Sequence, residues 1–245
     1  MICSTLGAFA LGNNFSPKVT SLLHPIMTAT TYTWGIVALF AAITGSSFGS
    51  VLSNYRVGSA NLLHAGAGDL LLYMLGPGVC SLSIAMYSRK TLMKSNLAAV
   101  LVGMLVSSTG GILSSALYVR FANIPGALLR LSLITRNVTT ALAMALTDIL
   151  GGNTAIIASL LVTTGVFGST FVRKFLDKVK IYDPVSRGLG VGAAAQGIGV
   201  ASLKEEKDSL PFAAINMILT ALCSSVLISI PVFREFVKRV ALGGV

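Results

Sequence analysis

PVSRGLGVGAAAQGIGVASL, residues 184–203, is the stretch that decides the fold. Five of the twelve residues from Gly188 to Gly199 are glycine, and Gln196 has the only side chain among them that makes directional hydrogen bonds. Glycine destabilises a helix by up to about 1 kcal/mol relative to alanine, so a helix in water avoids this composition. In a membrane, small residues let helix backbones pack closely, and a glycine-interrupted helix can open its backbone toward a ligand. Close packing and ligand binding both fit the glycines, whereas the isolated Gln196 favours a binding surface.

The composition identifies a membrane protein. Of the 245 residues, 54% are hydrophobic and 11% are charged, and the mean hydropathy of +0.82 lies outside the range of ordinary soluble domains. A bilayer crossing needs about 20 predominantly apolar residues. Uncharged runs of about that length or more cover residues 19–55, 70–88, 95–119, 149–172 and 209–233. Together with residues 127–152 and 184–203, they predict an all-α polytopic membrane protein with about seven membrane segments, forming one transmembrane domain over residues 1–245.

The net charge of +10 comes mainly from basic clusters beside the apolar runs, at residues 89–94, 173–180 and 234–239. Such clusters orient a chain in the membrane by the positive-inside rule, and we prefer that interpretation to nucleic-acid binding. The composition therefore points to membrane lipid as a partner, and not to nucleic acid.

The ends and the cysteines of the chain carry weaker signals. Cys3, Cys80 and Cys223 each lie in apolar sequence without metal-ligand spacing, which indicates buried small residues rather than disulfides or a metal site. Met1 to Gly12 is apolar but too short to span a bilayer, and it lacks the basic start and cleavage site of a signal peptide. Residues 1–24 are interpreted as a partial first helix followed by a turn, and the chain as a fragment of something longer.

A Gly-Pro-Gly sequence, Gly76 to Gly78, lies in the middle of the run from residue 70 to residue 88. Proline removes a backbone donor and glycine relaxes the backbone, so we expect the helix to break there into two half-helices. Transporters build solute sites at the open ends of such half-helices. A simple proline kink is the alternative.

Residues 127–152 contain a cation and several hydrogen-bonding side chains within an otherwise apolar segment. An arginine near the bilayer centre is costly unless it faces a cavity or a partner, so Arg136 is a candidate for a functional site. Asn137, Thr139 and Thr140 follow it directly and can all form hydrogen bonds.

The distribution of charge predicts the path of this segment. If residues 89–94 lie inside, the next span exits, and a full crossing by residues 127–152 would leave the four cations of residues 173–180 outside. A re-entrant hairpin with Thr135 to Thr140 at its tip restores agreement with the rule. The same count, with residues 184–203 as a crossing, places residues 204–208 outside and the basic C-terminus inside. An interrupted crossing remains an alternative to the hairpin.

Several motifs make the sequence resemble the LrgB/CidB family from about His24 to Arg239. They are GAGDLLLYMLG from Gly66, RNVTTALAM from Arg136, VTTGVFGSTFV from Val162, DPVSRGLGVGAAAQGIGVASL from Asp183 and LPFAAINMILTAL from Leu210. In that family the glycine-rich motif usually reads Ser-His-Gly-(Ile/Leu)-Gly, whereas Ala195 and Gln196 stand here in place of Ser-His. The departure puts in question any mechanism that needs a titrating imidazole at this position.

The resemblance implies a function. Plant and algal members carry small 2-hydroxy monocarboxylates, glycolate and glycerate, across the plastid inner envelope and support photorespiration, and this chain resembles their C-terminal half, without their N-terminal LrgA-like half. Bacterial members are antiholin-like regulators or pyruvate carriers of the bacterial cytoplasmic membrane. The implied partners are a carboxylate solute, an LrgA-like half or subunit, and further copies of the chain in a homo-oligomer.

Two classes of function follow from these observations. In the first, the chain is a secondary transporter in which Arg136 and half-helix N-termini bind a carboxylate, while neighbouring polar groups bind the hydroxyl. Arginines within spans, with few carboxylates, suit an anionic solute: Arg130, Arg136 and Arg187. In the second, the chain is a membrane regulator with no solute site, and residues 188–199 form an oligomer interface.

The residues predicted for the solute site are Arg136, Asn137, Thr139, Thr140, Gln196, Gly197, Gly199, Gly76 and Gly78. We expect no cofactor and no metal, and no catalytic residues. The acidic residues and histidines show no spacing for a nucleophile and base, so an enzyme is not indicated.

Overall fold

The computed structural model describes residues 1–15, 25–58 and 64–243, and within these ranges the chain is helical without strands. It divides into two compact units, Met1–Ser83 and Ile84–Val245. Five helices are long and apolar enough to cross a membrane: Pro25–Thr44, Ala67–Ser88, Leu97–Phe121, Thr154–Lys178 and Leu210–Ser229. The prediction of an all-α polytopic membrane protein is therefore confirmed. The second part of the predicted N-terminal turn, residues 16–24, lies outside the described residues.

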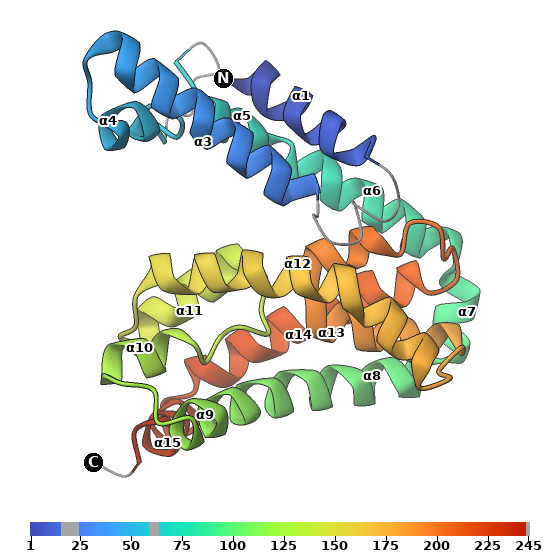
Figure 1. Cartoon of the computed structure of the whole chain (residues 1–245). Helices are drawn as coiled ribbons and strands as arrows, with labels where there is room; N and C mark the ends of the chain where they lie inside the picture. Colours follow the sequence, from blue (N-terminus) through green and yellow to red (C-terminus); the bar gives the residue numbers. More distant parts are fainter. Residues whose placement is uncertain (16–24, 59–63, 244–245) are drawn as a thin grey trace. The chain divides into compact units, whose positions relative to one another are not determined.

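The first unit is built around two helices, α1 (Ile2–Asn13) and α3 (Pro25–Thr44), which pack against each other (Figure 1). Gly12 allows their close approach, because a Cβ at this position would collide with the side chain of Thr28. The unit also contains two short helices, α4 (Phe48–Ser53) and α5 (Ala67–Tyr73), and the first part of the helix that follows α5.

The Gly-Pro-Gly sequence does not separate two half-helices, and that prediction is wrong. The helix is interrupted instead at Met74, between α5 and α6 (Leu75–Ser88), and the N–H of Gly78 donates to the Met74 carbonyl at 3.1 Å across it. Pro77 falls in the first turn of α6, where a backbone N–H has no partner within the helix and its loss costs little. Helical hydrogen bonding therefore continues past the proline.

The second unit begins within α6 and continues with α7 (Lys90–Ser95), α8 (Leu97–Leu105) and α9 (Gly111–Phe121). Residues 95–119 were predicted as one membrane segment, and within it a five-residue π-helical turn, η1 (Val106–Gly110), joins α8 to α9. Short π turns of this kind occur often at functional sites.

Residues 127–153 fold back on themselves, as the charge distribution predicted; we call this segment hairpin 1. It consists of α10 (Ala127–Ser132), a non-helical tip at residues 133–139, and α11 (Thr140–Leu150). At the base of the hairpin, the Asn153 N–H donates to Ser132 Oγ at 2.6 Å. Nearer the tip, the Thr135 and Thr147 hydroxyls are 2.6 Å apart.

The glycine-rich segment also folds back, and its prediction as a crossing is wrong. After α12 (Thr154–Lys178) comes α13 (Pro184–Ser202), whose helical path breaks at Gln196. The Arg187 guanidinium reaches Glu206, beyond the end of the helix, at 3.0 Å. Hence residues 184–203 form a second hairpin, hairpin 2, whose arms run from residue 184 to residue 195 and from residue 197 to residue 203.

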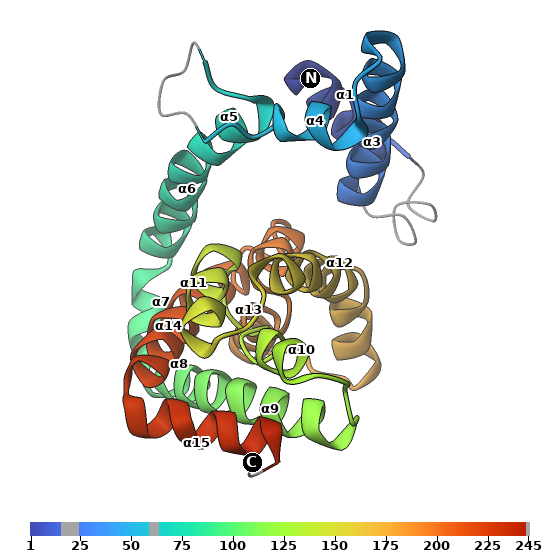
Figure 2. The ribbon, with the colours of Figure 1, turned by 90° about the vertical axis from the view of Figure 1, so that its left-hand side faces the viewer.

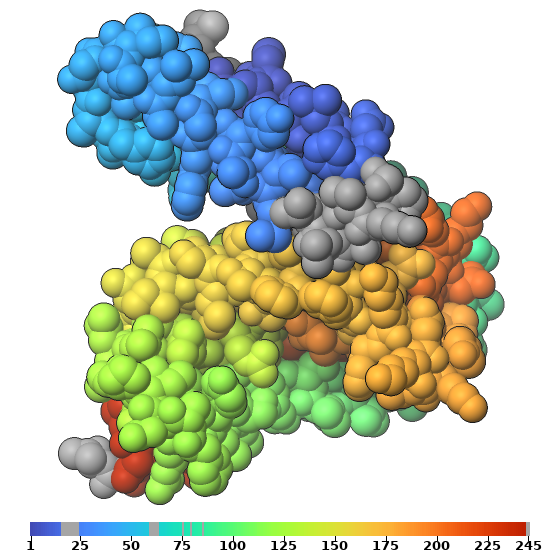
Figure 3. Space-filling view, in the orientation of Figure 1, coloured from blue at the N-terminus to red at the C-terminus, as the bar shows by residue number. Residues whose placement is uncertain are grey.

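The two hairpins enter the second unit from opposite ends. Arg89 pairs with Asp208 at 3.1 Å, so the base of hairpin 2 lies at the end where α8 starts. From there α14 (Leu210–Ser229) runs to the other end, where α15 (Pro231–Leu242) packs on α9 and α10 (Figure 2). The predicted sides of residues 204–208 and of the C-terminus are therefore wrong, because residues 184–203 do not cross. Figure 3 shows α12 spread across one face of this unit, with α8 along its lower edge.

Candidate functional site

The tips of the two hairpins meet inside the second unit. The side-chain amide of Gln196, at the tip of hairpin 2, donates from Nε2 to the backbone carbonyl of Asn137, at the tip of hairpin 1, at 2.5 Å. Gln196 has φ 50° and ψ −147°, which ends the first arm of its hairpin. A non-glycine residue in such a region costs about 1–3 kcal/mol and persists only where the surroundings impose it. We call the contact between Gln196 and Asn137 the hairpin junction.

Glycines impose the path of hairpin 2 by removing side-chain bulk on both of its sides. A Cβ at Gly168 of α12 would collide with Ala195, and a Cβ at Gly192 would collide with the Ala213 carbonyl of α14. Gly199 packs between the arms of the hairpin, where a Cβ would also collide with Ala195. The first arm is therefore held tightly between α12 and α14, so these glycines serve close packing.

The tip of hairpin 1 is held against α9 and the π turn. Asn137 Nδ2 donates to the Ser107 carbonyl at 3.1 Å, and a Cβ at Gly111 would collide with this amide. Arg136 Nε donates to the buried Ser115 hydroxyl at 3.0 Å. The remaining guanidinium nitrogens of Arg136 have no bonding partner among the described residues, and the side chain is exposed.

A helix N-terminus opens at the same place. α11 begins at Thr140, and its N-cap residue Thr139 makes no side-chain capping bond. The first N–H groups of a helix lack partners within the helix, and the helix dipole favours an anion there. Thr139 is half-buried and Thr140 is exposed, so a small anion can reach this end.

Two amide oxygens at the hairpin junction are buried without a hydrogen-bond partner in the described part of the chain: Asn137 Oδ1 and Gln196 Oε1. Their residues are only 7% and 8% exposed. Because each amide nitrogen already donates to a backbone carbonyl, the orientation of both amides is fixed and the free atoms are acceptors. An unsatisfied buried acceptor costs about 1–3 kcal/mol, so the pair indicates a place for a bound hydrogen-bond donor.

The structure brings most of the predicted site residues together. Arg136, Asn137, Thr139, Thr140 and Gln196 are tip or near-tip residues, and Gly197 is exposed beside Gln196. Gly199 serves the hairpin fold instead. Gly76 and Gly78 belong to the first unit, where a Cβ at either would meet nothing within 4 Å, and the junction is built without them.

Sequence reasoning missed the residues that support the junction. Asn216 on α14 is fully buried, and its Nδ2 donates to Ser107 Oγ at 3.2 Å and to the Leu189 carbonyl at 2.8 Å. It thereby ties the π turn to hairpin 2. Asn216 is an isolated amide in an apolar run, the signal that singled out Gln196, and the same criterion would have found it.

Two of the three arginines predicted to suit an anion are occupied by protein groups. Arg130 donates to the Ile124 carbonyl at 2.6 Å and to Asn123 at 3.2 Å. Arg187 bonds to Asp177 at 2.7 Å and to Glu206 at 3.0 Å. Among the three, Arg136 alone keeps unpartnered donors within the described ranges.

The ion cluster at the base of hairpin 2 closes that end of the unit. Arg173 joins it through Glu206 at 3.0 Å and through the Ser202 carbonyl at 3.2 Å. Hydrogen bonds from Arg187 hold the pKa of Glu206 below its ordinary value, against the opposing effect of burial, and the charge of Arg173 adds to the lowering. The cluster therefore stabilises the base with ionised groups and leaves no free cation of its own for a solute.

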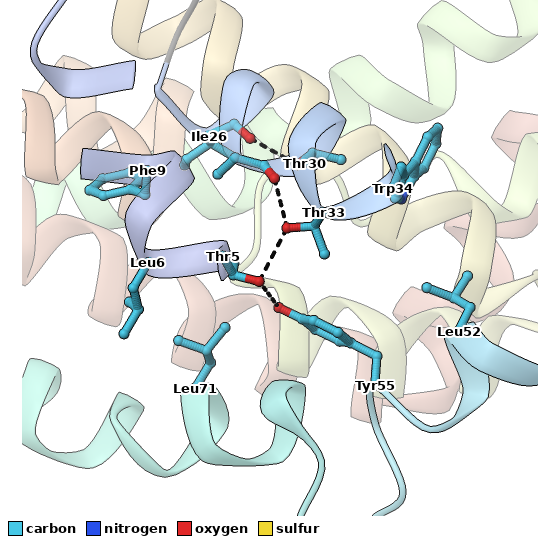
Figure 4. A pocket seen from close by; sticks show the side chains of 11 residues that line it. Thr5, Leu6, Phe9, Ile26, Thr30, Thr33, Trp34, Leu52, Tyr55 and Leu71 are labelled. Carbon is cyan, nitrogen blue, oxygen red and sulfur yellow. Dashed lines mark hydrogen bonds between the residues drawn. The ribbon is translucent and has the colours of Figure 1, made fainter. Parts of the chain in front are cut away.

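A cavity of about 330 Å³ in the first unit contains none of the predicted residues (Figure 4). Its walls are mainly apolar, with Phe9, Trp34 and Leu71 among them. The hydroxyl of Thr5 bonds to the hydroxyls of Thr33 and Tyr55, each at 3.1 Å, so these groups are satisfied without a ligand. The hairpin junction is the better candidate for a solute site, because its polar groups are not satisfied.

Comparison with known proteins places this arrangement in a family. The chain is 31% identical over 237 residues to plastidal glycolate/glycerate translocator 1, chloroplastic, of Arabidopsis thaliana, covering 96% of this chain and 46% of that protein. It is 30% identical over 166 residues to the holin-like protein CidB of Staphylococcus epidermidis, covering 66% and 71%. It is 28% identical over 156 residues to YwbG of Bacillus subtilis, covering 63% and 69%.

The chain thus spans about half the length of the Arabidopsis relative. No solved structure matches it. The model of the LrgB-like family matches residues 5–233, which include both hairpins, the π turn and helices α8, α9, α12 and α14. The chain belongs to the LrgB-like family of membrane proteins.

Proposed function

We propose that the chain is a secondary transporter that carries small 2-hydroxy monocarboxylates, glycolate and glycerate, and that the hairpin junction is its solute site. The observation that carries the proposal is the pair of buried, unpartnered amide oxygens where two hairpins from opposite ends meet. Irregular backbone at membrane depth is tolerated where it lines a cavity, and transporters place solutes at such interruptions. The name of the Arabidopsis relative supports the choice of solute and a location in the plastid, where we propose the inner envelope as the membrane.

The carboxylate of the solute binds at the tip of hairpin 1. Arg136 is held through Nε by Ser115, which leaves its two Nη groups to face a carboxylate as a fork. The N–H groups at the start of α11 supply further donors to the same anion.

The hydroxyl of the solute binds at the amide oxygens. Asn137 Oδ1 and Gln196 Oε1 accept hydrogen bonds and cannot donate them. A 2-hydroxyl group donates to such an oxygen, whereas the 2-keto group of pyruvate cannot. A site that pairs with a solute hydroxyl rejects an analogue lacking it, because the buried acceptor is then left unpaired. The junction therefore favours glycolate and glycerate over pyruvate.

Counterflow into proteoliposomes containing the full chain tests this proposal. Labelled glycolate, glycerate, lactate and pyruvate are supplied in parallel, and we expect faster uptake of the three hydroxy acids than of pyruvate. Arg136→Ala should abolish uptake, and Arg136→Lys should retain part of it, because lysine keeps the charge but loses the fork geometry. Arg120→Ala, at the exposed end of α9, is the matched control and should leave uptake unchanged.

The outcomes separate the functional classes. Absence of uptake of every solute, with folded protein in the vesicles, would reject the transporter and favour a holin-like regulator. Preference for pyruvate would favour a carrier of the bacterial type. Unchanged uptake in Arg136→Ala, at equal protein, would remove Arg136 from the site.

A further inference from the structure

α14 carries a row of polar side chains that faces the interior of the second unit. Asn216, Thr220 and Ser224 recur every four residues, and each is 0% exposed. Asn216 uses its amide nitrogen to support the π turn. Thr220 Oγ1 and Ser224 Oγ have no hydrogen-bond partner in the described part of the chain. The sequence offered no interpretation of either hydroxyl.

These two hydroxyls differ from others on the same helix. Serine and threonine in a helix commonly donate to the carbonyl four residues earlier. Ser225 does so to Ala221 at 2.8 Å, and Ser229 to Ser225 at 2.8 Å. Thr220 and Ser224 leave that bond unmade and leave their hydroxyls unsatisfied, at a cost of about 1–3 kcal/mol each. Valine would fill the space of Thr220, and alanine would remove only the hydroxyl of Ser224, in each case without that cost, so the hydroxyls indicate a ligand.

The contacts of α14 define where these hydroxyls point. Asn216 and Cys223 mark the side of the π turn, because they bond to Ser107 and Ser108. Met217 marks the side of hairpin 2, because its sulfur is the nearest atom to a Cβ placed at Gly197.

With a rotation of about 100° per residue, Thr220 and Ser224 fall about 40° and 80° around the helix from Asn216, between these two sides. Asn137, at the tip of hairpin 1, bonds both to Ser107 of the π turn and to Gln196 of hairpin 2, from which we infer that the tip lies in that direction. Thr220 also lies one turn beyond Met217 along α14 and before Cys223, level with the junction.

We propose that Thr220 and Ser224 form the wall of the solute site opposite the hairpin tips, where they bind the second hydroxyl group of a 2,3-dihydroxy carboxylate such as glycerate. This rests on the proposed transport function. Arg136 and α11 hold the carboxylate, an amide oxygen of Asn137 or Gln196 accepts from the 2-hydroxyl, and the α14 hydroxyls pair with the 3-hydroxyl. Glycolate has no second hydroxyl, so the α14 wall distinguishes the two solutes.

Thr220→Val and Ser224→Ala, alone and together, test the proposal. Valine matches the shape of threonine and removes an unsatisfied hydroxyl, so we expect folding to be preserved. The KM for glycerate in counterflow should rise about tenfold, the loss of roughly one hydrogen bond. The KM for glycolate should stay the same. Ser225→Ala removes a hydroxyl that is already bonded within α14 and should change neither KM.

Two results would overturn the proposal. An equal rise in the KM values for both solutes would show that the hydroxyls serve the fold, and no change in either KM would show that they bind water. A binding measurement separates this proposal from transport itself: glycerate should raise the melting temperature of the detergent-solubilised chain more than glycolate does, and Thr220→Val should abolish the difference. If the chain transports nothing but shows this difference, the transport function is rejected and the binding role of Thr220 and Ser224 is supported. If glycerate and glycolate stabilise the chain equally, that binding role is rejected.

Discussion

At the residue scale, Gln196 combines one property of its backbone with two of its side chain. Its positive φ turns hairpin 2, its Nε2 joins the two tips, and its Oε1 is free to accept from a donor. Its isolation among small residues in the sequence is enough to indicate a binding role. Its backbone conformation could not be predicted, because it is imposed by glycines on α12 and in α13 that pack against Ala195.

The departure from the histidine usual in the family leads to a prediction about pH. A glutamine amide replaces a hydrogen-bond donor but does not titrate, so uptake by this protein should be nearly flat from about pH 5.5 to 7.5. If the histidine of relatives serves only as a donor, Gln196→His should transport with the same flat profile, and Gln196→Ala should lose activity. Uptake against pH for the three proteins is the measurement. A steep dependence near pH 6.5 that appears only in Gln196→His would show that the imidazole carries a coupled proton.

At the scale of elements, one hairpin was predictable and the other was not. Hairpin 1 followed from the four cations of residues 173–180, because a full crossing would have put them on the wrong side. Hairpin 2 has no comparable signal: its inner residues are uncharged, and Arg187 at its base is matched by Asp177 and Glu206 only after folding. The Gly-Pro-Gly sequence led to the opposite mistake, because it predicted a break where the structure has a helix. A proline in the first turn of α6 is compatible with that helix.

The ion cluster at the base of hairpin 2 predicts an acid-sensitive contribution to stability. Because the pKa of Glu206 is lowered in the folded chain, its stabilisation is complete above the ordinary value of 4.5 and is lost as pH falls below that value. At pH 7, Glu206→Gln should therefore lower the free energy of unfolding by roughly 1–3 kcal/mol relative to the parent protein. The variant should melt at a correspondingly lower temperature. The difference should shrink toward pH 3.5. Thermal unfolding in detergent measures it, with Glu205→Gln, an exposed neighbour, as the control. A difference that stays constant with pH would contradict the assignment.

At the scale of the whole molecule, the second unit contains three helices long and apolar enough to cross a membrane and two hairpins, where the sequence suggested four crossings and one hairpin. Membrane spans are predicted from the length of apolar runs. α13 is long enough to be predicted as a span, although it folds back at Gln196. The consequence is that the basic helix α15 lies at the opposite end from the cluster at residues 89–94. It packs there on α9 and α10, with Arg130 reaching the Ala241 carbonyl at 3.5 Å.

Cysteine accessibility tests this topology. In a background without the three native cysteines, Lys94→Cys, Lys178→Cys and Lys204→Cys should all react with an impermeant maleimide from one side of the membrane, and Asn123→Cys from the other. Lys204 distinguishes hairpin 2 from a crossing, because a crossing would put it opposite Lys178. Labelling of Lys178→Cys and Lys204→Cys from different sides would reject hairpin 2, and labelling of Lys94→Cys and Lys178→Cys from different sides would reject hairpin 1.

The π turn also sets the phase between the two halves of the span that contains it. A π turn holds one residue more than the corresponding α-helical path, so the helix beyond it is rotated by about 100° relative to a regular helix. Ser107 lies within this turn and Ser115 after it, yet both face the tip of hairpin 1. Deleting one residue between them would restore regular winding and carry Ser115 away from Arg136, while Ser107 kept its place beside Asn137. The one extra residue of the π turn thus decides whether Arg136 and Asn137 of hairpin 1 are both held by the same membrane segment.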